Sequence, residues 1–244
     1  MHNTNQPHER PLITALPRRL AASATGTAIG LFARAVTAVQ AIWAGCAPIP
    51  RQRLYFANHT SNGDFVLIWT VLPPQMRATT RPVAAADYWL TSPIRSFVGR
   101  DVFNAVLIDR RPDARTDDPV TQMVNAAADG SSLIIFPEGQ RNMAGTGLLP
   151  FKSGLYHFAK LRPDIDLVPV WIANLNRVMP KGEIIPIPLI CTVTFGEPLH
   201  IQPAEAKDAF LARATAALIA TAPVTAPVTA PVTGAVTAPV TGAG

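Results

Sequence analysis

Charged residues and cysteines are both scarce in this chain of 244 residues. Only 15% of the residues are charged, whereas 48% are hydrophobic and the mean hydropathy is +0.21. The two cysteines, Cys46 and Cys191, have no zinc-site spacing and offer little basis for a disulfide framework. The composition therefore favours a reducing compartment and suggests contact with lipid or with a partner.

Several catalytic and binding motifs are also missing. No Gly-x-Ser-x-Gly segment occurs, which argues against a serine hydrolase of that type, and there is no Gly-x-x-x-x-Gly-Lys phosphate-binding loop. Nucleic acid is not an expected partner, because the chain has no basic run and no aromatic-basic RNA signature. No metal site is expected either, since metal spacing is absent from the five histidines, His2, His8, His59, His157 and His200.

Positive charge gathers near the N-terminus. Residues 1–53 hold six arginines and one acidic residue, Glu9, and so account for the whole formal net charge of +5. The pattern predicts a helix over Pro17–Trp43, with Ile29, Phe32, Val36, Val39 and Trp43 on one face and Thr27, Gly30, Arg34 and Thr37 opposite. We expect this amphipathic helix to lie in a membrane interface with Arg18 and Arg19 at the headgroups. Packing on the protein's own core is the alternative.

A secretory signal is not expected. Arg34 interrupts the apolar stretch. The lipoprotein-like segment Ala44-Gly45-Cys46 comes late for cleavage. We therefore expect the chain to be associated with the membrane at its cytoplasmic face.

Strand-like and helix-like runs alternate from residue 52 onward, which predicts an α/β fold with a mixed, largely parallel sheet covered by helices. The strand-like runs are Leu54–Ala57, Pro82–Ala86, Asn104–Ile108, Ser132–Phe136, Leu167–Ile172 and Ile184–Phe195. The helix-like runs are Asp64–Leu72, Tyr88–Arg100, Pro119–Ala128, Ser153–Leu161 and Pro203–Thr221. We divide the chain into a polar segment and membrane-interface helix (1–47), one α/β domain (48–221) and a disordered Ala-Pro-Val-Thr repeat tail (222–244).

The stretch His59-Thr-Ser-Asn-Gly-Asp64 follows an apolar strand-like run and precedes an apolar helical pattern. Histidine is the side chain best suited to act as a base near neutral pH, and the acid that follows can fold back to orient it. The plainer interpretation is that Asn62 or Asp64 only caps the helix and that His59 is a turn residue. The pair alone does not decide between the two.

Three further blocks change this balance. Arg110 follows a strand-like run, Glu138-Gly139-Gln140-Arg141 follows another, and Val168-Pro169-Val170 lies within a third. Together with Asn58, His59 and Asp64 they occur in the order typical of the glycerolipid acyltransferase superfamily, which the chain resembles over roughly residues 50–200. Its best-known members are the 1-acylglycerol-3-phosphate (lysophosphatidic acid) acyltransferases.

The match has two departures and one addition. Gln140 and Asn142 replace the Thr and Ser of the family's Glu-Gly-Thr-Arg-Ser block, which bears on the identity of the acceptor. Phe151-Lys152-Ser153-Gly154 resembles the Phe-Lys-x-Gly segment that follows this block in the family.

The resemblance implies an O-acyltransferase of phospholipid biosynthesis. A fatty acyl group would pass from acyl-CoA or acyl-carrier protein to the free hydroxyl of a lysophospholipid, and 1-acylglycerol-3-phosphate would give phosphatidic acid. No cofactor is implied beyond the acyl donor. The implied catalytic residues are His59 and Asp64, and the implied substrate-binding residues are Arg110, Glu138, Gly139, Arg141 and Lys152.

The residue types fit these roles but leave choices open. Arg110 and Arg141 suit a phosphate because guanidinium binds it bidentately, although Arg110 is also explained as a solvated charge at a strand end. Glu138 would hold an arginine or bind acceptor hydroxyls, and Lys152 would contact phosphate or face solvent. Backbone N–H groups after Asn62 are candidate oxyanion donors. Another lysolipid acceptor, a catalytically silent lipid-binding homologue and a thioesterase-like hydrolase are the alternative functions.

Overall fold

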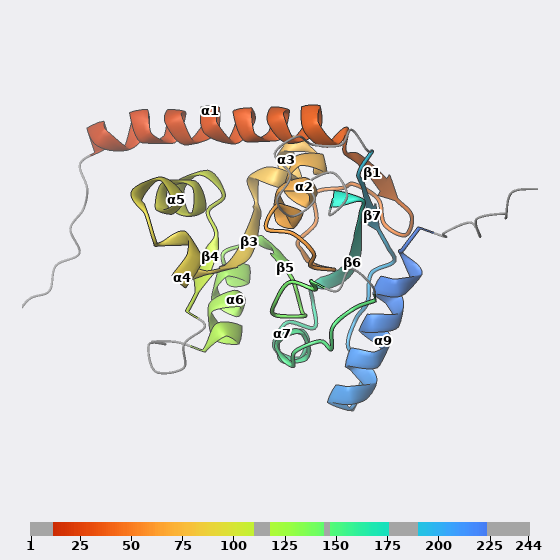
Figure 1. Cartoon of the computed structure of the whole chain (residues 1–244). Coiled ribbons are helices and arrows are strands. Elements are labelled where there is room, and N and C mark those ends of the chain that lie inside the picture. The colour runs from red at the N-terminus through yellow and green to blue at the C-terminus, as the bar shows by residue number, and fades with distance from the viewer. Residues whose placement is uncertain (1–11, 110–117, 144–146, 176–189, 224–244) are drawn as a thin grey trace, which may run out of the picture.

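The computed structural model describes residues 12–109, 118–143, 147–175 and 190–223. Within these residues a seven-stranded sheet lies between two layers of helices (Figure 1). Every neighbouring pair of strands is parallel except β6 and β7. The sheet therefore confirms the predicted α/β fold. In spatial order its strands are β1 (Gln40–Trp43), β7 (Thr192–Phe195), β6 (Asp166–Ala173), β2 (Arg53–Ala57), β5 (Ser132–Ile135), β3 (Thr80–Ala85) and β4 (Val106–Ile108).

Helices cover both faces of this sheet (Figure 1). One layer contains α1 (Leu12–Thr37), α2 (Asp64–Val71), α3 (Pro74–Ala78), α4 (Ala86–Trp89), α5 (Pro93–Phe97) and the π-helical turn η1 (Val98–Val102). The opposite layer contains α6 (Pro119–Ala128), α7 (Gly154–Leu161) and α9 (Lys207–Ala220).

The central strand β2 shows why two hydrophobic cores form. Successive side chains of a strand point to opposite faces of a sheet. Tyr55 and Ala57 pack in the core beneath α1 and α2, whereas Leu54 and Phe56 pack against α6, α7 and α9. All four are fully buried, as expected for a central strand covered on both sides.

The N-terminal helix ends before the predicted residue. α1 stops at Thr37, Ala38 adopts a φ of 44°, and Gln40–Trp43 forms the edge strand β1 beside β7. Trp43 then stacks on Phe195 of β7 with ring centroids 4.0 Å apart. The prediction of a helix was therefore wrong for residues 38–43. The apolar side chains Ala41 and Trp43 pack on the core from a strand, as they would from a continued helix, so their hydrophobicity alone did not distinguish the two. The segment 1–47 therefore contributes a strand to the sheet.

The predicted division of α1 into faces was wrong for Gly30, Phe32 and Thr37, whereas Thr27 and Arg34 are exposed as predicted. Ile29 and Val36 pack on the core, but Phe32 is 68% exposed, and Gly30 and Thr37 face the domain. The buried stripe consists of small residues, Ala22, Gly26, Gly30 and Ala33, whereas Leu16, Leu20, Leu31 and Phe32 face outward. By length and composition alone, Leu16–Thr37 could cross a membrane, with a mean hydropathy of 1.2 in its most apolar window.

One other predicted helix is broken. Residues 88–100 contain parts of α4, α5 and η1, because Ser92 and Pro93 start a new helix in which the Ser92 side chain accepts the Arg95 N–H. The remaining predicted runs correspond to observed elements with ends shifted by a few residues, except that only Thr192–Phe195 of the last strand is seen and residues 184–189 lie outside the described part.

Candidate active site

A cavity of about 620 Å³ lies at the carboxyl ends of β2, β3 and β5. Carboxyl ends of parallel strands meet at one edge of a sheet, and the loops that follow them commonly build sites there. His59 follows β2, Phe136 follows β5, and Val83–Ala85 close β3, so three loops far apart in sequence converge on the cavity.

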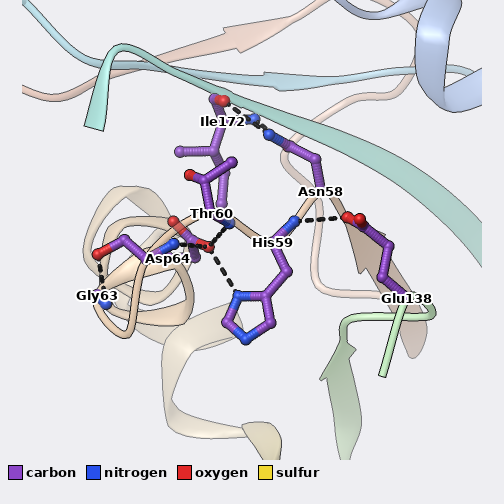
Figure 2. Close-up of polar contacts among 8 residues, drawn as sticks. Asn58, His59, Thr60, Gly63, Asp64, Glu138 and Ile172 are labelled. Atoms are coloured by element: carbon purple, nitrogen blue, oxygen red, sulfur yellow. Dashed lines mark hydrogen bonds and ion pairs between the residues drawn. The ribbon is translucent and has the colours of Figure 1, made fainter. Parts of the chain in front are cut away.

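His59 and Asp64 are in direct contact (Figure 2). The distance from His59 Nδ1 to Asp64 Oδ2 is 2.8 Å, and the Asp64 side chain is fully buried behind the half-buried histidine. With Nδ1 donating to the carboxylate, Nε2 is left as the proton acceptor. The imidazole also stacks on Phe136 with centroids 4.2 Å apart, which fixes the plane of the ring. His59 lines the cavity, so this arrangement is that of an oriented base.

Asp64 is more than a helix cap. The N-cap of α2 is Gly63, and Asp64 Oδ2 accepts the backbone N–H groups of Thr60 at 2.6 Å and Ser61 at 2.8 Å in addition to the histidine. The carboxylate thereby stabilises the turn and orients the base at the same time. A carboxylate at the start of a helix is also favoured by the helix dipole.

The turn leaves few donors for an oxyanion. The N–H groups of Thr60 and Ser61 point to Asp64, that of Gly63 donates to Ser61 Oγ, and that of Asp64 donates to the Ser61 carbonyl. These four donors are engaged within the turn itself, and two of them, the N–H groups of Gly63 and Asp64, belong to the segment after Asn62 that the sequence suggested for the oxyanion.

Asn58 ties the start of this loop to β6. Its side-chain oxygen accepts the Ile172 N–H at 2.8 Å, and its Nδ2 donates to the Ile172 carbonyl at 3.0 Å (Figure 2). The amide is buried. It supplies hydrogen-bond partners for both the N–H and the carbonyl of Ile172 at the point where β2 ends.

Glu138 clamps two loops through their backbones. Its Oε1 accepts the His59 N–H and its Oε2 accepts the Leu149 N–H, both at 2.9 Å (Figure 2). The residue is only 1% exposed and lies behind the cavity wall, whose described residues do not include it. Both carboxylate oxygens thus fix the main chain that carries the base.

The loop after β5 holds His59 from a second side. The Asn142 N–H donates to the His59 carbonyl at 2.7 Å, and the Asn142 Nδ2 donates to the Gly147 carbonyl. Gly139 has a φ of 71°, and a Cβ placed there would lie 3.2 Å from the Lys152 side chain. Glycine therefore permits both the turn and the position of Lys152 across it.

The cavity wall carries both cationic and apolar side chains. Arg141 and Lys152, both exposed, line it near His59 and Gly139, and no acidic residue is among the described residues of its wall. Arg110 lies outside the described residues, so its predicted place in the site stays a prediction. The apolar wall residues include Phe65, Val83, Trp89, Ile108, Met123, Ile135 and Leu155. Where the chain is described, no group of three His, Cys, Asp or Glu side chains could hold a metal ion.

Sequence reasoning did not find the apolar walls of the cavity. They come from β3, β4, α4, α6 and α7, whose side chains look like ordinary core positions in the sequence. Gln140, noted as a departure from the family block, lines the cavity. Asn142, the second departure, is buried in the loop that supports His59.

Comparison with known proteins agrees with this geometry. A family model described as "Acyltransferase" matches residues 45–173, more than half of the chain and the part that contains the His59–Asp64 pair. The chain belongs to the acyltransferase family. The matched segment begins just after β1 and extends to the end of β6, so it also includes Glu138.

Curated relatives of this acyltransferase carry a common name. A "1-acyl-sn-glycerol-3-phosphate acyltransferase" of Salmonella typhimurium is 31% identical over 131 residues, covering 51% of this chain and 48% of the relative. The protein of that name from Escherichia coli is 30% identical over 138 residues, 51% of each chain, and that of Cocos nucifera is 29% identical over 60% of this chain and 45% of its own. The chain thus spans about half the length of the relatives it matches.

A solved structure shares the fold. The crystal structure of the 1-acyl-sn-glycerophosphate (LPA) acyltransferase PlsC from Thermotoga maritima aligns with a TM-score of 0.61, covering 84% of this chain and 81% of that one. At 21% sequence identity the likeness concerns the fold of this acyltransferase and not its substrates.

Proposed function

We propose that this acyltransferase moves a fatty acyl group from acyl-CoA or acyl-carrier protein to the free hydroxyl of 1-acylglycerol-3-phosphate, giving phosphatidic acid in phospholipid biosynthesis. The observation that carries the proposal is the His59–Asp64 contact at 2.8 Å, with His59 in the wall of a cavity lined by cationic and apolar side chains. Several relatives bear the name of this activity.

The chemistry needs one base and no covalent enzyme intermediate. His59 Nε2 takes the proton of the acceptor hydroxyl as its oxygen attacks the thioester carbonyl carbon. Asp64 stabilises the imidazolium that forms. The tetrahedral intermediate then collapses, the carbon–sulfur bond breaks, and the thiolate leaves with the proton from His59, so the products are the ester and a free thiol.

The cationic and apolar side chains of the cavity wall fit an amphiphilic acceptor. Arg141 and Lys152 supply positive charge for a phosphate close to the base, with Arg110 as a further candidate beyond the described residues. The whole cavity, at about 620 Å³, lies within the usual range of about 300–1,000 Å³ for ligand pockets, and its apolar wall residues accommodate hydrocarbon. Glu138 and Gly139 act here through the backbone and through the placement of Lys152.

Membrane association completes the proposal. The outward Leu16, Leu20, Leu31 and Phe32 of α1 and the basic N-terminal segment support contact with an anionic bilayer. The cytoplasmic face is proposed because thioester donors are made in that compartment.

The deciding experiment replaces the base. We expect His59→Ala to lower turnover by at least about a hundredfold with the fold and vesicle binding unchanged. His157→Ala is the matched control, because His157 is exposed on α7 and is not part of the cavity wall. Transfer of a labelled acyl group to 1-acylglycerol-3-phosphate measures both. Turnover of the His59 variant close to that of the unmodified protein would disprove the assignment of the base.

The acceptor is tested by product mass spectrometry with a mixed pool of lysolipids and acyl donors. We expect phosphatidic acid to dominate. A different dominant product would assign another acceptor, to which Gln140 in the cavity wall would contribute. Free fatty acid without any acceptor would indicate a hydrolase, and binding to vesicles without any transfer would indicate a silent lipid-binding homologue.

A further inference from the structure

Large apolar side chains are exposed beside the mouth of the cavity. Tyr88, Leu90 and Ile94 are 39%, 44% and 76% exposed. They lie in the segment Tyr88–Arg95, which we name the lip and which contains the end of α4, the connection to α5 and the start of α5. A single exposed apolar residue needs no explanation, but a group of them on a solvent-exposed face indicates an interaction surface.

The lip is anchored from its inner side. Trp89 makes an edge contact with Phe65, with centroids 5.9 Å apart, and packs near Phe103. A Cβ at Gly99 would lie 3.1 Å from the Trp89 ring, so a larger residue at that position would require the ring to shift. The outward side chains are therefore presented by a firmly packed segment, on the same side of the sheet as α1 (Figure 1).

The lip is continuous with the cavity. Tyr88 and Trp89 belong to its wall, and so does Met143, which is 60% exposed. The guanidinium of Arg95 lies 4.7 Å from the Tyr88 ring centroid, which adds a cation to the apolar group.

The charges around the mouth are complementary to an anionic surface. Arg95 on the lip and Arg141 and Lys152 in the wall are exposed cations. Asp87 adjoins the lip but is engaged in an interaction within the protein. Apolar side chains interspersed with arginines suit the interface of a bilayer that contains anionic lipid.

We infer that the lip docks against an anionic phospholipid bilayer, so that the mouth of the cavity opens onto the membrane and receives the acceptor from it. This inference rests on the proposed function, since it concerns how a lipid acceptor reaches His59. It adds a second contact to the one proposed for α1, made by Leu90 and Ile94, which do not line the cavity.

The test compares two double variants with the same change in charge. Leu90→Glu/Ile94→Glu alters the lip. Leu161→Glu/Ile219→Glu alters two other exposed apolar positions, 59% and 54% exposed, on α7 and α9 in the opposite helical layer (Figure 1). With vesicles of equimolar phosphatidylglycerol and phosphatidylcholine, we expect the lip variant to lose about tenfold in transfer to vesicle-embedded acceptor. Transfer to a short-chain, water-soluble acceptor stays within about twofold, because the cavity is untouched.

The outcomes separate this inference from the proposed function. Absence of transfer by the unmodified protein to both acceptors would remove the function. Transfer by the unmodified protein with equal activity of the lip variant on vesicles would overturn the docking alone, as would an equal loss in the α7/α9 variant. A dimer that the lip substitutions dissociate would assign the surface to a second copy of the chain and would also overturn it.

Discussion

Glu138 shows how a buried carboxylate can serve a reaction without touching the substrate. It accepts a hydrogen bond from the His59 N–H and another from the Leu149 N–H. His59 lies in the loop after β2, and Leu149 lies in the connection between β5 and α7. Glutamine at this position has one acceptor oxygen, and its NH₂ would face a backbone N–H. One of the two loops would therefore lose its partner, and the base would shift.

We expect Glu138→Gln to lower kcat about tenfold to a hundredfold while KM for the acceptor changes little, because a misplaced base affects the reaction and not the binding. Steady-state kinetics with varied acceptor measure the two constants separately. Glu205→Gln, far from the cavity, is a control for the substitution itself. A raised KM with unchanged kcat would instead favour the direct contact with substrate that the sequence predicted.

The contact between His59 and Asp64 was predictable because both residues lie in one short turn, where spacing decides which side chains meet. The role of Glu138 was not, since the bond to His59 joins positions 79 residues apart and uses the main chain. A side chain's type indicates which charge it brings to a site, but backbone partners depend on how loops from separate strands converge. Arg141 and Lys152 were named through the resemblance of their blocks to those of the family, and both line the cavity.

α1 shows how apolar spacing can mislead about which face is buried. Large apolar residues were taken for one face, but the close approach of the helix to Trp69 and Val102 requires small residues. Gly26 and Gly30 occupy that stripe, and large side chains are left on the outside. Close packing of backbone on side chains selects residue size, which a pattern of hydrophobicity alone does not register.

The two glycines of this stripe should respond differently to alanine. A Cβ at Gly30 would lie 3.9 Å from its nearest neighbours, so Gly30→Ala should raise the free energy of unfolding by about 0.5–1 kcal/mol through helix propensity. A Cβ at Gly26 would lie 3.2 Å from Val102, so Gly26→Ala should gain little or lose stability. Urea unfolding measures both. Equal stabilisation would show that α1 does not pack tightly at Gly26.

The start of α9 is held by an ion pair that should respond to pH. Glu205 accepts from Arg213 Nε at 2.9 Å and Nη2 at 2.7 Å, and also from the Gln202 N–H. The hydrogen bonds from Arg213, assisted by that of Gln202, hold the pKa of Glu205 below its ordinary value. A depressed pKa in the folded state means that stability is present above the unfolded-state pKa and is lost as the pH falls through the folded-state pKa.

We therefore expect Glu205→Gln to lower the free energy of unfolding by about 1 kcal/mol at neutral pH. The difference from the unmodified protein should persist down to about pH 4, near the unfolded-state pKa, and shrink as the pH is lowered further through the depressed folded-state pKa. Urea unfolding at several pH values measures it. A difference that stays constant with pH would attribute the loss to hydrogen-bond geometry and not to the carboxylate charge.

The sheet explains why these distant segments act together. Parallel order was predictable from alternating strands and helices, and it alone places the ends of β2, β3 and β5 at one edge. The spatial order of the strands and the antiparallel pairing of β6 with β7 were not predictable, since both depend on long-range packing. The edge strand β1 was missed for the same reason, because it pairs with β7, which is its neighbour in space but lies far along the chain.

Charge is distributed unevenly over the chain, and this should determine how it binds vesicles. The segment 1–53 carries the whole net charge of +5, although Arg18 within it is paired with Asp101 at 2.6 Å. Arg19, which is exposed, should therefore contribute more to membrane binding than a lysine on the opposite helical layer, such as Lys160 of α7.

We expect Arg19→Gln to weaken binding to phosphatidylglycerol-containing vesicles about fivefold, as one basic residue near such a surface contributes about 1 kcal/mol, whereas Lys160→Gln should change it little. Raising the salt from about 0.1 M to about 1 M should remove the difference, because the Debye length falls from about 10 Å to about 3 Å. Co-sedimentation with vesicles measures both effects. Equal weakening by the two substitutions would mean that the net charge of the protein, and not the position of its N-terminal arginines, governs its binding to the membrane.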